Sequence, residues 1–468
     1  MSGAPAPGRE AAAVLAALFD PGSFTAVSDP AEGGPPGVLT GHGTVEGRAV
    51  CAVAQAPGGA PGAAAVEAEV RLRALAARTG KPLVTVHDAT GPGSARGFGE
   101  LVRGAVALSG VVPQVAVVTG AADAERALLL PLADVVVAAE GSRSALADPA
   151  AAAVLTGRER DARQLGGAAL HAAVTGRAAH VAPGPAAAAA FVRELLGHLP
   201  GNVLATPPRL PPGAVRVADE DPDEELDALL PADPDAPYDV RDVLARLADD
   251  EEPPLELHAR HAAGVLTGFT RLDGRSLGVV APDPSVAGGA LDAPAAAKAA
   301  RFVRFCDAFG VPVLTLVDTA GVVPAGEDDP GAPTVAVAQL LYAYAEASVP
   351  LLTVVTGRAH GAALLALGSR HVGADAVLVW PRARLGARDA VAEVAAGHGH
   401  GPAPAAGEWA RLVARREAER SPAAAVRAGD ADAVVGPGRT RAHLARWLDL
   451  LERKAVTPPA RRHGNLPL

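Results

Sequence analysis

The apolar positions of the chain fall into short runs that alternate with longer segments of helical periodicity. Leu83–Val86 and Val313–Val317 are rich in β-branched residues and are bounded by proline and aspartate, which is typical of buried strands. Ala64–Arg78 and Ala295–Phe309 precede them and repeat apolar residues at helical spacing. Two further buried strands are expected at Val50–Ala54 and Leu277–Ala281. Strands that alternate with helices predict an α/β fold with a largely parallel sheet.

The same pattern occurs twice along the chain. Three blocks recur in the same order, at separations of 227, 230 and 237 residues. The pairs are Gly37–Gly41 with Gly264–Gly268, Gly80–Asp88 with Gly310–Asp318, and Val117–Gly120 with Val354–Gly357. Ordered matches with a slowly growing separation indicate a duplication and not a short-period solenoid. We therefore expect two homologous domains, residues 1–235 and 236–468.

A change of composition marks the junction between the two halves. Pro207–Pro254 is rich in proline, aspartate and glutamate and contains two acidic runs. This composition is typical of a solvated linker. One short amphipathic helix is expected within it, at Val240–Leu247.

The overall composition narrows the classes of function. The chain has 468 residues, of which 49% are apolar but only 3% are aromatic, so alanine and valine must supply most of the core. There are 52 acidic and 42 basic residues, which leaves a net charge of −10. This balance argues against nucleic acid as the main partner, because phosphate binding depends on clustered Lys and Arg.

Three features of the sequence indicate a cytoplasmic protein without a membrane segment. Cys51 and Cys306 cannot form a disulfide framework, which favours a reducing compartment. The first ten residues lack the basic and apolar regions of a signal peptide. The longest uncharged stretch, Gly104–Ala122, is interrupted by Pro113 and Gln114, and so fits a helix, a turn and a strand better than a membrane span.

The candidate chemistry lies where a buried strand runs into a turn of small residues and then an apolar helix. Val354–Leu365 is the second copy of this pattern. Small residues let a ligand approach the backbone, and the amides at a helix start converge on anionic oxygen. Such a turn can serve as an oxyanion hole built from backbone donors. A tight connection without function is the alternative, and the spacing alone favours it.

Other kinds of site find less support in the sequence. Gly91–Arg96 is glycine-rich but lacks the Rossmann spacing, and neither a P-loop nor a Gly-x-Ser-x-Gly elbow is present. Two histidine pairs fit solvated loops better than a metal site, so no metal is expected. They are His258 with His261 and His398 with His400.

Taken together, the motifs resemble the carboxyltransferase (β) subunit of biotin-dependent acyl-CoA carboxylases. The most specific stretches are Lys298–Phe309 and Leu340–Glu346, and Asp233–Arg241 is similar to the interdomain segment of that family. The resemblance implies two tandem crotonase-like domains, each a ββα superhelix. It also implies a homo-oligomer built from dimers, hexameric in many members, with active sites between the N-terminal domain of one subunit and the C-terminal domain of the other.

The resemblance further implies the reaction and its partners. The N-terminal domain would bind an acyl-CoA, and the C-terminal domain would accept carboxybiotin on a separate biotin carrier protein that a biotin carboxylase loads. Carboxylate would move to the α-carbon of the thioester through an enolate held by backbone oxyanion holes. An acyl group carried on an acyl-carrier protein is an alternative substrate.

In the second half, the residues that the resemblance implies are largely preserved. Gly361, Ala362 and Ala363 occupy the start of the family's Gly-Gly-Ala-Tyr-Asp motif and would hold the biotin oxygen. Leu365 replaces the aspartate of that motif, which is linked to substrate selection. Asp318 and Gly321 keep the outline of a family loop that would bind substrate.

The first half departs further from the family pattern. Gly120 begins the corresponding turn, and Ala124 and Glu125 take the places of its two glycines, so their amides would hold the thioester oxygen. A Cβ can oppose the required dihedrals, and a carboxylate is unfavourable beside a developing enolate.

Three further substrate-binding positions are implied in this half. Asp88 and Arg96 flank a shortened loop, and Arg71, beside Val70 at the family's lysine position, would reach a CoA phosphate. The departures leave two alternatives open. One is a catalytically attenuated paralogue with a structural role in a carboxylase complex. The other is a biotin-independent decarboxylase of a malonyl-type thioester.

Overall fold

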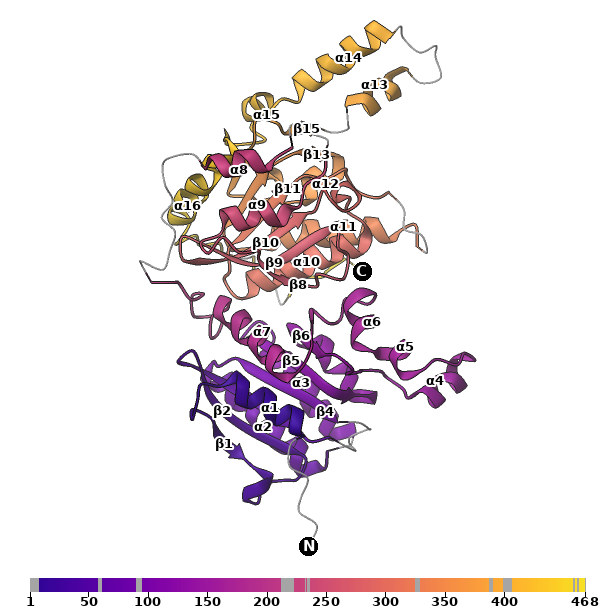
Figure 1. Ribbon diagram of the computed structural model, residues 1–468, viewed down its shortest axis with the longest axis vertical. Coiled ribbons are helices and arrows are strands. Elements are labelled where there is room, and N and C mark those ends of the chain that lie inside the picture. The colour runs from indigo at the N-terminus through magenta and orange to yellow at the C-terminus, as the bar shows by residue number, and fades with distance from the viewer. Residues whose placement is uncertain are drawn as a thin grey trace. The chain divides into compact units, whose positions relative to one another are not determined.

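The computed structural model divides the chain into two compact units (Figure 1). The first comprises Met1–Pro208 with Leu257–His261, and the second comprises Arg209–Glu256 with Ala262–Leu468. The described residues are 8–57, 61–89, 95–211, 223–231, 233, 236–324, 329–386, 390–398, 406–457, 459–460 and 463–467. Each unit is described below by itself.

The first unit is built on a seven-stranded sheet whose strands follow one another in sequence order. The strands are β1 (Thr25–Ser28), β2 (Val38–Val45), β3 (Arg48–Gln55), β4 (Leu83–Ala89), β5 (Gln114–Ala122), β6 (Val135–Ala139) and β7 (His180–Ala182). The β1–β2 and β2–β3 pairs are antiparallel, and every later pair is parallel. This confirms the expectation of a largely parallel sheet.

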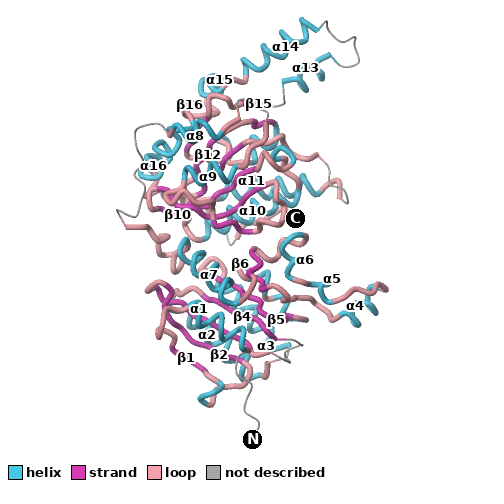
Figure 2. The backbone as a smooth tube through the Cα atoms, in the orientation of Figure 1, coloured by secondary structure: helices cyan, strands magenta, loops and turns pink. Residues whose placement is uncertain are grey.

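Helices cover both faces of this sheet. They are α1 (Arg9–Leu18), α2 (Ala63–Thr79), α3 (Ala95–Leu108), α4 (Pro149–Thr156), α5 (Ala162–Gly166), α6 (Ala168–Ala173) and α7 (Pro185–His198). The pair α2 and α3 packs on one face, and the pair α1 and α7 packs on the other. Figure 2 shows the same alternation of strands and helices along the chain. Alanine and valine dominate the core of this unit, as the composition predicts.

The second unit repeats the sheet with the strand order β16-β14-β12-β11-β10-β9-β8. Its strands are β8 (Leu255–Leu257), β9 (Val265–Leu272), β10 (Arg275–Pro282), β11 (Val313–Val317), β12 (Leu351–Val355), β14 (Ala376–Val379) and β16 (Ala433–Val434). A separate two-stranded sheet joins β13 (Arg358–His360) to β15 (Arg384–Gly386) in parallel.

The helices of the second unit also lie on both faces of its sheet. They are α8 (Glu224–Leu229), α9 (Val240–Leu247), α10 (Ala293–Ala308), α11 (Ala332–Glu346), α12 (Gly361–Ala366), α13 (Ala390–His398), α14 (Ala406–Glu419), α15 (Pro422–Ala428) and α16 (Thr440–Leu450). The buried side chains of α8, α9 and α16 share one core with β9–β12 and β14. The α10 and α11 helices pack together on the opposite face.

The duplication predicted from the sequence is visible element by element. The β3–α2–β4 segment of the first unit corresponds to β10–α10–β11 of the second. The α2 and α10 helices begin and end within two residues of the predicted bounds. Each is followed by a glycine of positive φ, Gly80 (60°) and Gly310 (65°). The left-handed conformation that often ends a helix favours glycine at this position.

The boundary between the units lies closer to the N-terminus than the predicted residue 235. Leu226 of α8 is buried in the core of the second unit, and the amide of Asp223 donates to the carbonyl of Gly438. Much of the acidic segment is therefore part of the second unit. Its composition resembles that of a linker because only one face of each short helix is buried.

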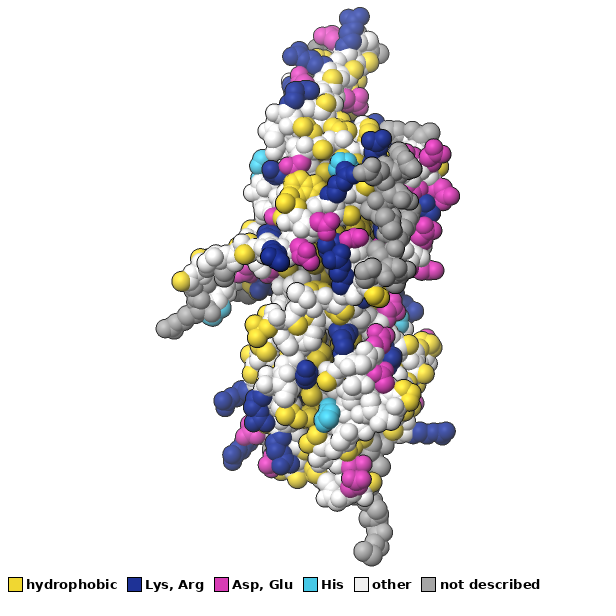
Figure 3. Space-filling model, turned by 90° about the vertical axis from the view of Figure 1, so that its left-hand side faces the viewer, with side chains coloured by type: hydrophobic (Ala, Val, Ile, Leu, Met, Phe, Trp, Pro, Cys, Tyr) yellow, Lys and Arg dark blue, Asp and Glu magenta, His cyan; other side chains and the backbone are white. Residues whose placement is uncertain are grey.

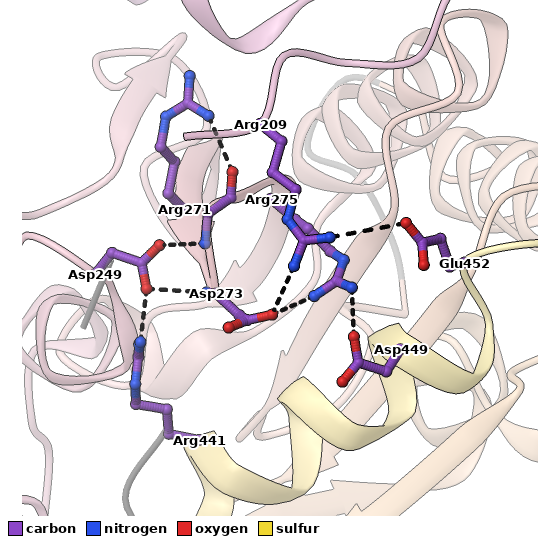
Figure 4. A network of polar contacts seen from close by, with 9 residues as sticks. Arg209, Asp249, Arg271, Asp273, Arg275, Arg441, Asp449 and Glu452 are labelled. Carbon is purple, nitrogen blue, oxygen red and sulfur yellow. Dashed lines mark hydrogen bonds and ion pairs between the residues drawn. The ribbon is translucent and has the colours of Figure 1, made fainter. Parts of the chain in front are cut away.

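Ion pairs tie this segment to the second unit (Figure 4). The Asp249 carboxylate accepts hydrogen bonds from the amides of Asp273 (2.9 Å) and Gly274 (2.7 Å), and it pairs with the buried Arg441 at 2.6 Å. Arg209 pairs with Asp273 at 3.2 Å. The turn between β9 and β10 is thus held from two sides.

The face drawn in Figure 3 carries Lys and Arg interspersed with Asp and Glu. Within the described residues, none of the helices is long and apolar enough to cross a bilayer.

Candidate active site

The site in the second unit forms where β12 leaves the sheet. The chain passes through Gly357 into β13 and then turns into α12, whose first residue, Gly361, has a φ of 58°. A left-handed dihedral at this point favours glycine, because a Cβ adds strain there. Parallel pairing of Arg358 with Arg384 fixes the direction in which the turn approaches the helix.

The amides of Ala362 and Ala363 lie in the first turn of α12. A helix provides no acceptor for the N–H groups of its first turn, and the side chain of His360 does not cap it. Ala362 is exposed, whereas Ala363 is fully buried. The turn can therefore present backbone donors to an anionic oxygen. Leu365 follows on the same helix with 44% of its surface exposed.

The carboxylate of Asp318 supports this turn from below. Asp318 is 3% exposed, and its Oδ1 accepts hydrogen bonds from the backbone N–H (3.0 Å) and the Nε (3.1 Å) of Arg358. A Cβ on Gly357 would overlap the carboxylate. Asp318 therefore positions the turn, and Gly321, whose amide donates to Thr319 Oγ1 at 3.0 Å, stabilises the adjacent loop.

A tyrosine from the segment before β8 completes the support. The phenol of Tyr238 lies 3.0 Å from Thr356 Oγ1, and it also interacts with Asp318. Burial, together with the Asp318 carboxylate, raises the pKa of this phenol well above its usual range, so the hydroxyl stays protonated. The sequence alone indicates Tyr238 only as part of Asp233–Arg241, because its partners Asp318 and Thr356 lie far along the chain, Thr356 118 residues away.

The first unit repeats the arrangement at the end of β5. The carboxylate of Asp88 lies against Gly120, where a Cβ would overlap it, and it accepts a hydrogen bond from the amide of Ala121 at 3.3 Å. Ala121 pairs with Arg143 in parallel, as Arg358 pairs with Arg384 in the second unit. Here no arginine follows the glycine, and burial raises the pKa of Asp88 above its usual value.

The turn that follows corrects one expectation from the sequence. Ala124 has a φ of 58°, the same value as Gly361, and stands at the equivalent position after its glycine. Its amide donates to the carbonyl of Ala145 at 2.8 Å and so is not available to a substrate. The residues equivalent to Ala362 and Ala363 are Glu125 and Arg126. They lie in a 3-10 helix, Ala124–Leu128, in which the Arg126 amide bonds back to its N-cap, so Glu125 supplies the amide without an intrahelical acceptor. Glu125 thus stays in the candidate set, Ala124 supplies the bend, and Arg126 was missed.

Comparison with known proteins places this geometry in a family. The family described as carboxyl transferase domain matches residues 9–466. This chain belongs to the carboxyl transferase family. It is similar to the propionyl-CoA carboxylase beta chain of Saccharopolyspora erythraea, with 39% identity over 455 residues that cover 92% of this chain and 83% of that protein.

A second relative and a solved structure agree. The biotin-dependent acetyl-/propionyl-coenzyme A carboxylase beta5 subunit of Mycobacterium tuberculosis is 37% identical over 454 residues, which cover 92% of this chain and 82% of that protein. The crystal structure of the transcarboxylase 12S hexamer, with methylmalonyl-coenzyme A and methylmalonic acid bound, superposes with a TM-score of 0.90 at 33% identity. That match covers 98% of this chain and 93% of the other. The two units of this carboxyltransferase are therefore crotonase-like domains.

The two basic residues expected to bind substrate lie on separate helices of the carboxyltransferase. Arg71 is exposed on α2, and Arg96 is exposed at the start of α3, where it pairs with Glu100 at 3.5 Å. Both are accessible to a phosphate. The loop before α3, residues 90–94, lies outside the described residues. The role of Arg71 and Arg96 in substrate binding stays a prediction.

In the first unit, a cavity next to the segment that follows Ala124 is lined by Ser144 and His171. His171 Nε2 lies 2.8 Å from the carbonyl oxygen of Ser144 and 3.2 Å from its Oγ, and Nδ1 lies 3.0 Å from Thr175 Oγ1. The carbonyl can only accept, so Nε2 carries the proton and donates it. This tautomer cannot take a proton from Ser144, which excludes a serine nucleophile activated by His171.

Metal binding finds no support in the described part of the carboxyltransferase. Among those residues, no three His, Cys, Asp or Glu side chains are grouped so that they could hold an ion.

Proposed function

We propose that this carboxyltransferase moves carboxylate from carboxybiotin, carried on a separate biotin carrier protein, to the α-carbon of an acyl-CoA. The transfer breaks the N–C bond of carboxybiotin and the α-C–H bond of the thioester. It forms an N–H bond on the ureido nitrogen and a C–C bond at the α-carbon, so atoms and charge balance. Both the ureido oxygen and the thioester oxygen gain negative charge on the way.

One observation carries this proposal, namely that both units present the same turn. Gly361 and Ala124 share a φ of 58° and precede amides at a helix start, those of Ala362 and Ala363 in the second unit and that of Glu125 in the first. Two oxygens that gain charge need two sets of donors, and a duplicated fold supplies them. We assign the turn of the second unit to the biotin oxygen and the turn of the first unit to the thioester oxygen. The exposed Leu365 on α12 stands at the position that the resemblance links to substrate selection, and we assign it a part in the choice of acyl group.

The proposal includes partners and location. A biotin carboxylase and its carrier would supply the carboxyl group, and an acyl-CoA or an acyl-carrier protein would accept it. The resemblance to the family implies that each site combines the first unit of one subunit with the second unit of another. We therefore expect a homo-oligomer built from dimers, and a hexamer is the assembly of transcarboxylase 12S. We propose that the enzyme works in the cytoplasm.

A second candidate function is an attenuated subunit with a structural role. It is favoured by the turn of the first unit, where Ala124 adopts a left-handed dihedral and the residue after it, Glu125, carries a carboxylate whose Oε2 is buried. Under this alternative the oligomer would form, the carrier would bind, and no acyl-CoA would be carboxylated.

A transfer assay separates the two. Purified protein is mixed with carrier that has been carboxylated with labelled bicarbonate, and with acetyl-, propionyl- or butyryl-CoA. We expect label to appear in at least one acyl-CoA product. No turnover with any of the three, together with normal assembly, would support the structural role. In that case, restored activity in the double variant Ala124→Gly/Glu125→Gly would locate the defect in this turn.

A further inference from the structure

The core of the first unit contains a cluster of charged side chains next to the turn that begins at Ala124. Glu69, Arg73, His87 and Arg126 are each at most 4% exposed. Arg126 Nη1 pairs with Glu69 Oε1 at 3.2 Å, and Gln55 Nε2 donates to the same oxygen at 3.3 Å. A buried ion pair is costly to assemble and costly to break, so it restrains the segments that it joins.

The second unit serves as an internal comparison for this cluster. The duplication places four apolar residues where the first unit has its charges: Ala299, Val303, Val317 and Ala363 in place of Glu69, Arg73, His87 and Arg126. All four apolar residues are at most 2% exposed. The fold therefore does not need charge at these positions.

Neighbouring residues make room for the cluster. Gly104 on α3 faces the stem of Arg73, and a Cβ there would lie 3.2 Å from Arg73 Cδ. One carboxylate faces two guanidinium groups, so with a neutral His87 the cluster has a net charge of +1. This charge lies behind the segment that contains Glu125, and it offsets the Glu125 carboxylate.

The ion pair connects the turn to a helix that the backbone bonds do not reach. The amides of Ala122 and Ala124 donate to the carbonyls of Arg143 and Ala145, which fixes one side of the turn. The Arg126 side chain extends to Glu69 on α2 and fixes the other side. In the second unit Ala363 has no side chain that could make such a link.

We propose that Glu69 and Arg126 are positioning residues for the thioester oxyanion hole, and that their ion pair holds the amide of Glu125 toward the substrate. This inference rests on the proposed function, because it assigns the first turn to the thioester. In this proposal the Glu69–Arg126 ion pair positions the turn at which the family pattern has two glycines.

The double variant Glu69→Ala/Arg126→Ala tests the proposal, because it installs the pair found in the second unit and removes both members of the ion pair. The matched control, Asp249→Asn/Arg441→Met, removes a buried ion pair beside the β9–β10 turn, at the end of the second unit's sheet opposite the Gly361 turn. We measure kcat, the Kd of acyl-CoA, loss of label from the carboxylated carrier without acyl-CoA, and hydrogen exchange in residues 121–129. The conservative variant Arg126→Lys tests rescue.

We expect kcat to fall by about tenfold to a hundredfold in the double variant, as misplacement of a catalytic group produces. The Kd and the loss of label from the carrier should change by less than about twofold, and exchange should rise in residues 121–129. Arg126→Lys should retain more activity than the double variant.

Equal losses of kcat in the double variant and the control, or unchanged exchange in residues 121–129, would overturn the proposal that the Glu69–Arg126 ion pair positions this turn. An inactive wild-type enzyme would instead refute the proposed function. Hydrogen exchange would then decide alone whether Glu69 and Arg126 hold the turn.

Discussion

The carboxylate of Asp318 lies directly beneath Gly357, and its Oδ1 accepts the backbone N–H of the next residue at 3.0 Å. Asp88 and Gly120 repeat this relationship in the first unit. In both units the aspartate lies at the C-terminal end of one strand, β4 or β11, and the glycine lies at the C-terminal end of the neighbouring strand, β5 or β12. The pair therefore sets the height at which each turn leaves the sheet.

Replacing Gly357 with alanine should destabilise the protein. The added Cβ overlaps a carboxylate that is itself buried and fixed by two hydrogen bonds, so the cost should be about 1–3 kcal/mol, as for an overpacked core. Denaturant unfolding measures it. Gly99→Ala is the control, because nothing lies within 4 Å of a Cβ on that exposed helical residue, and it should be neutral or stabilising. Equal stability of the two variants would contradict this role of Asp318.

Substitutions at the two left-handed positions should change stability in opposite directions. Ala124→Gly relieves a Cβ at a φ of 58° and should stabilise by up to about 1 kcal/mol, whereas Gly361→Ala should destabilise by about 1 kcal/mol or more. Thermal or denaturant unfolding of both variants checks the signs. A change of the same sign in both would show that the two turns are not equivalent.

Much of the fold follows from sequence patterns that act over short distances. The helix bounds of α2 and α10, the strands on either side and the duplication all depend on local periodicity and on glycines such as Gly80 and Gly310. The domain boundary was wrong because the acidic composition around α8 does not reveal that Leu226 packs into a core.

The site was harder to predict, for a physical reason. The available amides depend on which carbonyls lie opposite, and the bond from Ala124 to Ala145 forms only when the turn pairs with the next segment. Arg126 and Glu69 are 57 residues apart, and no spacing rule joins them. Comparing the two copies position by position would have found both, since Ala363 and Ala299 stand in the same places.

Acid should destabilise the protein partly through His87. Burial, and then Arg126 and Arg73, lower its pKa to about 3, so it stays neutral in the folded state, whereas an unfolded histidine titrates near 6.5. As pH falls below about 6.5, the unfolded state takes up a proton that the folded state refuses, and stability falls until about pH 3. Stability is regained as pH rises through 6.5.

His87→Val, which copies Val317 of the second unit, should remove this dependence. The wild-type stability should fall more steeply than that of the variant, by up to about 1.4 kcal/mol per pH unit between pH 6 and 4. Denaturant unfolding at a series of pH values gives both slopes. Parallel curves would show that His87 does not titrate differently on unfolding.

A single-turnover transfer experiment tests the central claim most directly. Carrier protein labelled in its carboxybiotin group is mixed with excess enzyme and propionyl-CoA, and the distribution of label is followed in time. If the turns of the two units hold the biotin oxygen and the thioester oxygen, label should leave the carrier and appear in an acid-stable carboxyl group at the α-carbon of the acyl-CoA. Label that remains on the carrier, or is released only as CO2, with acetyl-, propionyl- and butyryl-CoA alike would contradict it.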